Sequence, residues 1–216
     1  MSMKLVYFNV RGLAETSRMI LAVAEQQYED FRYPLDVVDM ATHQMVKDEF
    51  DKDKEDGKLV SSLNKVPYLE VDNQIIPQSK TIERFLATRF NMMGNTDIER
   101  ARIDSICECV RDFKDMYQKV RVAEDKATAM NEWFTVTLVE RLTLLENLLG
   151  DDGLSVGLTT SLSDVVLYSL ITNFFDNKEA SMNATLATPK LRKIIDRVHS
   201  LPQMVQWLEN RPKTDF

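Results

Sequence analysis

Residues 64–71 read NKVPYLEV, and residues 77–80 read PQSK. The Val66–Pro67 bond stands directly before a run of β-forming residues. Because proline has no amide hydrogen and bars the preceding residue from helical backbone, Val66 is predicted to be extended at the start of a strand. Its free N–H and C=O then form an edge to which an extended peptide can add as a further strand. X-Pro bonds become cis at low cost, and a cis Pro67 is one way to hold such an edge open.

A hairpin and a helix are predicted directly after this edge. Asp72 and Asn73 are typical of a tight turn, and residues 74–76 of the returning strand. Apolar residues then recur at helical spacing, with Ser79 expected as the N-cap. Free amides at a helix start attract anions. A short acidic peptide is therefore a candidate ligand, although the same elements also make an ordinary α/β core.

The composition is that of a globular protein with one or two domains. The chain has 216 residues, of which 44% are hydrophobic and 28% charged. No apolar run approaches the length of a bilayer span, and the first residues, MSMK, lack the hydrophobic region of a signal peptide. A net charge of −7 without a basic stripe argues against nucleic acid. Cys107 and Cys109 would point to different faces of one helix, which favours reduced thiols and the cytosol.

The pattern of predicted elements changes near residue 91. Before it, strands and helices alternate in the order βαβ-α-ββα, which predicts a small mixed sheet flanked by helices. Ahead of the edge, strands are expected at residues 4–8 and 28–33, and helices at residues 14–25 and 37–56. The last helix is expected because Met40, Met45, Val46 and Phe50 recur at helical spacing. After it, helices alone are expected, starting at the Thr96–Glu99 capping box, near residue 128, at Ser161, and after Pro189 and Pro202. We therefore expect an α/β domain at residues 1–90 and an all-helical domain at residues 96–216.

The chain lacks the usual motifs of several enzyme classes. A small sheet in this order resembles thioredoxin, yet no Cys-x-x-Cys follows the first strand, where residues 7–12 read YFNVRG. If this domain performs sulfur chemistry, the sulfur must arrive with the ligand. His43 and His199 are far apart in sequence and are expected to be surface or packing residues. No nucleophile elbow, phosphate loop or dinucleotide fingerprint is present.

Tyr7 is the best catalytic candidate. It ends the first strand, where a side chain can emerge into a cleft. A phenol is a strong O–H donor, and a donor held against a thiol lowers the pKa of that thiol. The resulting thiolate is the reactive form. A tyrosine packed in the core could occupy the same position in the sequence. Tyr7 is therefore chosen as the catalytic candidate because of the missing protein thiols and the predicted peptide-binding edge.

With these residues assembled, the chain resembles the cytosolic glutathione transferases, and most closely their sigma class, which includes glutathione-dependent prostaglandin D synthases. The motifs that carry the resemblance are YFN-x-RG-x-AE at residues 7–15, KVPYLEVD at 65–72, Gln78-Ser79, GNT at 94–96, Asp112-Phe113, Ser161-x-x-Asp164 and RPKT at 211–214. They span nearly the whole chain. The resemblance implies a thioredoxin-like domain followed by a helical domain, glutathione as co-substrate, and a cytoplasmic homodimer that takes part in detoxification.

The resemblance also implies a set of glutathione-binding residues. These are Tyr7, Phe8, Lys65, Val66, Pro67, Gln78, Ser79 and Asp112. Tyr7 would hydrogen-bond the glutathione sulfur, and Val66 would pair its backbone with the cysteinyl residue. Gln78 and Ser79 would hold the γ-glutamyl carboxylate at the helix start. Asp112 would reach the γ-glutamyl amine from the other subunit of the dimer.

Two regions depart from the family pattern. Leu13 stands where many sigma-class enzymes carry an arginine close to the sulfur. The segment after Phe50 is longer than usual, and Phe50 would replace a tryptophan. The glycyl carboxylate would then be held near Phe50 and Lys54, with help from Lys65. Charge-assisted contacts of this kind suit a ligand with two carboxylates.

The co-substrate site and a possible metal site are the remaining implications. A hydrophobic pocket would lie between the Tyr7 loop and the first long helix. Its candidate residues are Val10, Leu13, Met116, Tyr117 and Phe216, although packing is an equal explanation for Met116 and Phe216. Related prostaglandin D synthases bind a divalent ion through acidic residues at positions that read Glu108, Arg111 and Asp112 here. Since Arg111 would repel a cation, we predict no metal.

These expectations combine into one function and two alternatives. The expected reaction is attack by a Tyr7-stabilised glutathione thiolate on an electrophilic carbon of a small hydrophobic compound. One alternative is a glutathione-dependent isomerase acting on prostaglandin endoperoxides. The other is a non-catalytic ligand-binding or structural relative of the lens crystallins.

Overall fold

The computed structural model of the chain describes residues 2–39 and 44–214. Two compact units are present, one made of Met1–Leu86 with Gln206–Phe216, and one made of Ala87–Val205. The helical domain expected from the sequence, residues 96–216, includes this C-terminal segment. The described part of that segment belongs to the first unit, where its side chains bond to Glu15.

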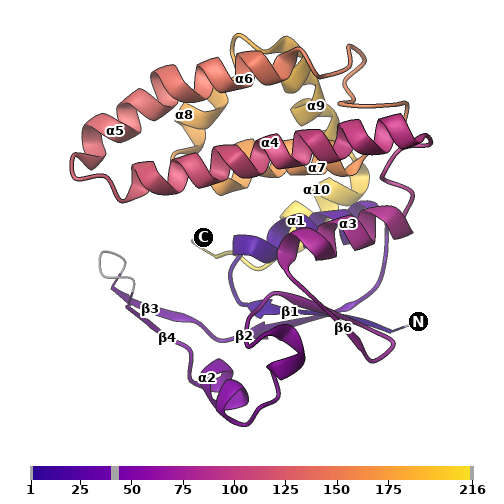
Figure 1. Cartoon of the computed structure of the whole chain (residues 1–216), viewed down its shortest axis with the longest axis vertical. Helices are drawn as coiled ribbons and strands as arrows, with labels where there is room; N and C mark the ends of the chain where they lie inside the picture. Colours follow the sequence, from indigo (N-terminus) through magenta and orange to yellow (C-terminus); the bar gives the residue numbers. More distant parts are fainter. Residues whose placement is uncertain (1, 40–43, 215–216) are drawn as a thin grey trace. The chain divides into compact units, whose positions relative to one another are not determined.

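The first unit is built on a four-stranded mixed sheet (Figure 1). Its strands are β1 (Met3–Phe8), β2 (Glu29–Tyr33), β5 (Tyr68–Val71) and β6 (Gln74–Pro77). Their order is β2-β1-β5-β6, with β1 parallel to β2 and antiparallel to β5, and β5 antiparallel to β6. Asp72 and Asn73 both have positive φ, at 46° and 65°, as the tight turn between β5 and β6 requires.

Helices flank this sheet, with α1 and α3 side by side on one of its faces (Figure 1). The helical segments are η1 (Gly12–Ala14), α1 (Glu15–Val23), α2 (Asp48–Glu55), η2 (Val60–Ser62) and α3 (Ser79–Arg89). Leu5, Leu69, Ile20 and Ile82, from the two central strands and from α1 and α3, are completely buried. The apolar face of the sheet is thus covered as its alternating pattern predicts.

The prediction of one helix over residues 37–56 is wrong in its first part. An antiparallel hairpin of β3 (Asp36–Asp39) and β4 (Gln44–Val46) occupies that part, and α2 begins only at Asp48. Of the apolar residues read as a helical stripe, Phe50 is buried, Met45 and Val46 are exposed, and Met40 lies outside the described residues. Backbone pairing between the two strands therefore overrides a weak helical spacing.

The regular elements of the second unit are all helices among its described residues. Its elements are α4 (Asp97–Arg121), α5 (Lys126–Glu132), a π-helical turn η3 (Trp133–Thr137), α6 (Leu138–Glu146), α7 (Leu162–Ser169), a second π-helical turn η4 (Leu170–Phe174), α8 (Lys178–Asn183), α9 (Pro189–Ser200) and the start of α10 (Pro202–Asn210). The long helix predicted after residue 128 is the run α5–η3–α6. The short helix α8 was not predicted, because its sequence, KEASMN, has no apolar residues at helical spacing.

Capped helices organise the core of this unit. All eight residues of α7 are buried, and α7 packs against both α4 and α9. The capping boxes predicted at Thr96–Glu99 and Ser161–Asp164 are confirmed, with side-chain and backbone bonds in both directions. Within the part of the chain that the structure describes, none of the helices combines the length and the apolar character needed to span a bilayer.

Candidate functional site

Strand pairing brings three of the predicted segments to one end of the sheet. Tyr68, the first residue of β5, pairs with Val6 of β1 on one side and with Pro77 of β6 on the other. Tyr7 therefore lies beside the segment before Tyr68, which in turn lies beside the segment after Pro77. Those two segments contain Val66, Pro67, Gln78 and Ser79. Residues about 70 positions apart in sequence thus meet at the same sheet end.

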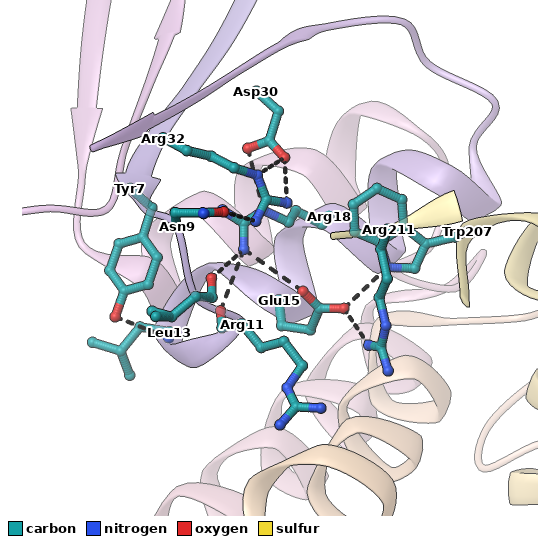
Figure 2. Close-up of polar contacts among 11 residues, drawn as sticks. Tyr7, Asn9, Arg11, Leu13, Glu15, Arg18, Asp30, Arg32, Trp207 and Arg211 are labelled. Carbon is teal, nitrogen blue, oxygen red and sulfur yellow. Dashed lines mark hydrogen bonds and ion pairs between the residues drawn. The ribbon is translucent and has the colours of Figure 1, made fainter. Parts of the chain in front are cut away.

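The side chain of Tyr7 is held by the loop that follows β1. Only 8% of Tyr7 is exposed, and its phenolic oxygen accepts a 3.2 Å hydrogen bond from the backbone N–H of Leu13 (Figure 2). Gly12 makes this approach possible, since a Cβ there would lie 2.7 Å from the phenolic oxygen. Gly12 also has a φ of +40°, which a side chain would strain. The loop is consequently shaped around the tyrosine hydroxyl.

The surroundings of Tyr7 keep its phenol neutral. Burial raises the pKa of Tyr7, while the Leu13 N–H and the positive charge of Arg18 act in the opposite direction. The carbon at the centre of the Arg18 guanidinium lies 6.0 Å from the centre of the tyrosine ring. Because the oxygen already accepts the bond from Leu13, the phenolic hydrogen can be donated to a ligand atom. Such an arrangement suits the stabilisation of an anion at the end of β1.

The Val66–Pro67 bond is cis, as the resemblance implies. Val66 is half-buried and precedes the first residue of β5 that pairs with β1 and β6. The backbone of Val66 therefore takes part in neither of these two strand pairings, although it leads directly into β5. An extended peptide laid across this position could pair with its backbone as a strand would.

The start of α3 differs in one detail from the sequence prediction. Ser79 is the first helical residue, and the carbonyl of Gln78 accepts the first helical bond, from the N–H of Ile82 at 3.0 Å. Gln78, rather than Ser79, thus occupies the N-cap position. Gln78 has a φ of +73°, a left-handed conformation that is uncommon outside glycine. Strain of this kind is often found at ligand-binding positions, and the unpaired amides of a helix start attract anions.

The region predicted to bind the glycyl end of glutathione contains a packed aromatic cluster and two exposed lysines. Phe50 is buried, with its ring 5.1 Å from Phe8 and 5.6 Å from Tyr33. The hydroxyl of Tyr33 donates a 2.8 Å hydrogen bond to Asp53, which anchors α2 on the sheet. The predicted cations, Lys54 and Lys65, are both exposed.

The residues predicted for the co-substrate pocket have different surroundings. Val10 is buried, whereas the side chain of Leu13 is 57% exposed beside Tyr7. In the helical unit, Met116 is half-buried and Tyr117 is completely buried. Phe216 lies outside the described residues. These assignments stay predictions.

Tyr117 belongs to an aromatic cluster of the helical unit. Its ring lies within 5.9 Å of the ring centres of Trp133, Phe134, Phe174 and Phe175, which come from or directly follow the two π-helical turns. Its hydroxyl donates a 3.3 Å bond to Asp176, and burial raises the pKa of Tyr117 to about 12. Tyr117 also lines a cavity of about 410 Å³ between α4, α5 and α8.

Two acidic residues of α4, Glu108 and Asp112, form ion pairs with the same arginine. Arg111 lies 2.8 Å from a carboxylate oxygen of Glu108 and 3.9 Å from one of Asp112, which is itself exposed. Among the residues that the structure describes, no group of three or more His, Cys, Asp or Glu side chains could hold a metal ion. The absence of a bound metal and the role of Asp112 stay predictions.

Sequence reasoning missed Gly12 and Arg18, which shape the surroundings of Tyr7. Arg18 is fully buried, and its guanidinium donates a 2.7 Å hydrogen bond to the carbonyl of Val10. One feature of the sequence could have identified Arg18. Arg18 directly precedes Met19, Ile20 and Leu21, so a charge is predicted at the edge of an apolar helix segment, where it needs a partner.

Comparisons with known proteins agree along the length of the chain. Residues 3–88 match the family model described as "Glutathione S-transferase, N-terminal domain", and residues 111–211 match that of the C-terminal domain. The chain is 34% identical to a hematopoietic prostaglandin D synthase from Gallus gallus, covering 98% of this chain and 97% of the relative. It is 29% identical to glutathione S-transferase 1 from Ascaris suum, covering 99% and 98%. The structure of monomeric Na-GST-3, a glutathione S-transferase from Necator americanus, matches with a TM-score of 0.82 and 29% identity over 100% of both chains.

Proposed function

Because the chain belongs to the glutathione S-transferase family, whose enzymes use glutathione as co-substrate, we propose that Tyr7 stabilises the glutathione thiolate for attack on a hydrophobic electrophile. The observation that carries this proposal is the hydrogen bond from the Leu13 N–H to the phenolic oxygen of Tyr7. It occupies an acceptor site of that oxygen and leaves the phenolic hydrogen for the sulfur.

The spacing of the sheet supports glutathione as the ligand. Tyr7 lies in β1, the Val66–Pro67 segment directly precedes β5, and the Gln78–Ser79 segment directly follows β6, so the three lie at the same end of three neighbouring strands. Neighbouring strands lie about 4.8 Å apart, so the outer two segments are roughly 10 Å apart. An extended tripeptide spans about 10 Å. The sulfur can therefore reach Tyr7 while the γ-glutamyl carboxylate lies at the start of α3.

The chemistry of each segment suits one part of the tripeptide. Val66 offers a strand-like backbone to the cysteinyl residue, and the amides that begin α3 at Gln78 and Ser79 attract a carboxylate. Pro67 belongs to the Val66 segment, and Phe8 and Lys65 are the chain neighbours of Tyr7 and Val66. Near the glycyl end, Phe50 would replace the family's tryptophan, and the exposed Lys54 and Lys65 would attract the glycyl carboxylate.

We assign Asp112 to the γ-glutamyl amine of glutathione bound to the other subunit of a homodimer. Asp112 is exposed on α4, and that exposure leaves it accessible to a partner. A sigma-class, cytoplasmic detoxification enzyme completes the proposal. The similar Necator structure is described as monomeric. The molar mass in solution, measured by light scattering, therefore decides this point, and a mass near twice 25.0 kDa is expected.

The Tyr7→Phe variant tests the catalytic proposal. It should lower kcat/KM for a chloronitrobenzene substrate by about 10²-fold at neutral pH, the scale of one well-placed proton donor. Since burial raises the pKa of Tyr7, the wild-type rate should rise through the thiol pKa and show no falling limb below pH 10. Tyr168→Phe, which removes a phenol bonded to His199, is the matched control and should retain activity. Equal rates for Tyr7→Phe and wild type at every pH would remove Tyr7 from this role.

A glutathione-dependent isomerase is the second candidate function. The observation in its favour is the 34% identity to a prostaglandin D synthase over nearly the whole chain. Leu13 and Arg111 count against it, because they stand where the sequence resemblance expects an arginine and a cation-binding acid. Product analysis with a prostaglandin endoperoxide and glutathione distinguishes the two, since an isomerase yields a D-type product and a pure transferase yields none.

A further inference from the structure

One buried carboxylate joins the C-terminal segment to the helix that follows the Tyr7 loop. Glu15, the first residue of α1, is 2% exposed. Its Oε1 atom accepts a 3.0 Å hydrogen bond from Nε1 of Trp207 and a 2.6 Å bond from Nη1 of Arg211 (Figure 2). The three residues belong to the same compact unit, although nearly 200 positions separate them in sequence.

The other oxygen of this carboxylate faces Arg18. Glu15 Oε2 lies 3.6 Å from Nη1 of Arg18, one helical turn further on. The same Nη1 atom donates to the carbonyl of Val10 at 2.7 Å and to that of Arg11 at 3.4 Å. These two carbonyls directly precede Gly12 and Leu13, whose backbone fits around the Tyr7 hydroxyl. One amino group of Arg18 therefore connects Glu15 to the Tyr7 loop.

A second contact fixes the orientation of Arg18. Its Nε donates a 3.2 Å bond to Asp30, and Asp30 also accepts a 2.9 Å bond from Arg32. Arg32 donates to the side chain of Asn9 at 3.4 Å, at the start of the same loop. Figure 2 shows the resulting chain of contacts from Arg211 to the loop. Because Asp30 holds Nε, the guanidinium cannot turn without breaking a charge-assisted bond.

Two carboxylates in this chain of contacts fix the place of a positive charge near Tyr7. Arg18 lies between Glu15, at 3.6 Å, and Asp30, at 3.2 Å. Its guanidinium is 6.0 Å from the centre of the Tyr7 ring. Since a buried charge acts more strongly than the same charge in water, a shift of Arg18 would change the electrostatic field at the phenol.

We infer that Trp207 and Arg211 are positioning residues for Tyr7. Acting through Glu15 and Arg18, they hold the loop so that the Leu13 N–H stays bonded to the phenolic oxygen. The effect of this inference on glutathione rests on the proposed function. The coupling from Trp207 and Arg211 to the Tyr7 loop, here called the mechanical link, does not require a ligand. Removing the Arg211 charge leaves Glu15 to draw Arg18 away from the loop carbonyls.

Hydrogen exchange of the ligand-free protein tests the mechanical link. In Arg211→Gln and in Trp207→Phe, the backbone amides of residues 10–13 should exchange about tenfold faster than in wild type, because their local opening becomes easier. Two controls separate this effect from general destabilisation. Arg100→Gln removes an exposed arginine that pairs with Asp97, and Ile20→Val removes one buried methylene from α1 itself. Neither control should change exchange at residues 10–13 selectively.

The pKa of the bound glutathione thiol tests the consequence for chemistry. It is measured from the ultraviolet absorbance of the thiolate as a function of pH. Arg211→Gln should raise this pKa by about half a unit to one unit, which lowers the thiolate fraction three- to tenfold below the pKa. Arg211→Lys should restore part of the shift, because the charge returns without the planar fork. The affinity for S-methylglutathione, which has no ionisable thiol, should remain within about twofold, since the tripeptide contacts lie elsewhere.

The possible outcomes separate the two proposals. If Arg211→Gln leaves both the exchange of residues 10–13 and the thiol pKa at wild-type values, Arg211 has no positioning role, and unchanged exchange in Trp207→Phe removes that role from Trp207. If Ile20→Val changes both readouts as much as Arg211→Gln does, the link is merely structural, and the inference is overturned. If wild type fails to bind glutathione, the proposed function is lost, while the exchange measurement still decides on the link.

Discussion

The backbone N–H of Leu13 lies 3.2 Å from the phenolic oxygen of Tyr7 and donates a hydrogen bond to it. The side chain of Leu13 is 57% exposed, so this position contributes to the surroundings of Tyr7 through its backbone. An arginine is expected here from the resemblance to sigma-class enzymes. In this chain the nearby positive charge comes from Arg18, on the following helix.

Gly12→Ala should displace the hydroxyl of Tyr7 and lower the activity. The added Cβ would lie 2.7 Å from the phenolic oxygen and 2.9 Å from a ring carbon, so the ring or the loop must move. We expect a loss of at least about tenfold in kcat/KM, because a displaced donor loses most of its catalytic effect. Steady-state kinetics with a chloronitrobenzene substrate measure this loss.

Gly57→Ala is the control for this variant. Gly57 has a φ of +75°, but a Cβ added there would meet no heavy atom within 4 Å, so alanine adds backbone strain without a clash. Strain of this kind costs about 1–2 kcal/mol in either variant. Equal kinetic effects of the two substitutions would contradict a steric role for Gly12.

The stability of the protein should fall at high pH because of its buried tyrosines. Burial raises the pKa of Tyr117 from 10.0 to about 12, so the folded state binds this proton more tightly than the unfolded state. The resulting stability is complete below pH 10 and is lost as the pH rises from 10 to about 12. Tyr7, Tyr28, Tyr33 and Tyr68 have pKa values raised in the same direction and add to the effect.

Urea unfolding across this pH range measures the contribution of Tyr117. In Tyr117→Phe, the free energy of unfolding should decline less steeply between pH 10 and 12, by up to about 1.4 kcal/mol per pH unit for one proton. His199→Asn, which removes the partner of Tyr168 but not an alkaline proton, should leave the slope unchanged. A wild-type slope in Tyr117→Phe would show that this tyrosine titrates normally.

Asp164→Asn should destabilise the helical unit strongly. The Asp164 carboxylate is completely buried and accepts hydrogen bonds from the backbone N–H groups of Ser155 and Ser161, at 2.6 and 2.7 Å. An amide at this position would turn an N–H₂ group toward one of these donors, so we expect a loss of about 2–4 kcal/mol. Asp125→Asn, at the exposed N-cap of α5, should cost about 1 kcal/mol or less, since asparagine caps nearly as well. Similar losses, measured by thermal and urea unfolding, would contradict this reasoning.

Local chemistry made several elements predictable from the sequence. Capping boxes, prolines in first turns and positive-φ turn residues act through neighbours within a few positions, so Thr96, Ser161, Pro189 and the Asp72–Asn73 turn could be located. The helix predicted across residues 37–56 failed for the opposite reason. Its first part pairs with a strand, and pairing depends on a partner segment that the periodicity does not reveal.

The sequence alone determined the family, most of the element order and the candidate sulfur-binding tyrosine, because these depend on motifs and on local backbone preferences. Only the tertiary structure decided how Tyr7 is held. The Gly12 contact, the buried Arg18 and the bonds from Trp207 and Arg211 to Glu15 join residues far apart in the chain. Such contacts arise from the packing of a strand, a helix and a C-terminal segment into one unit, and no periodicity or spacing in the sequence encodes their distances.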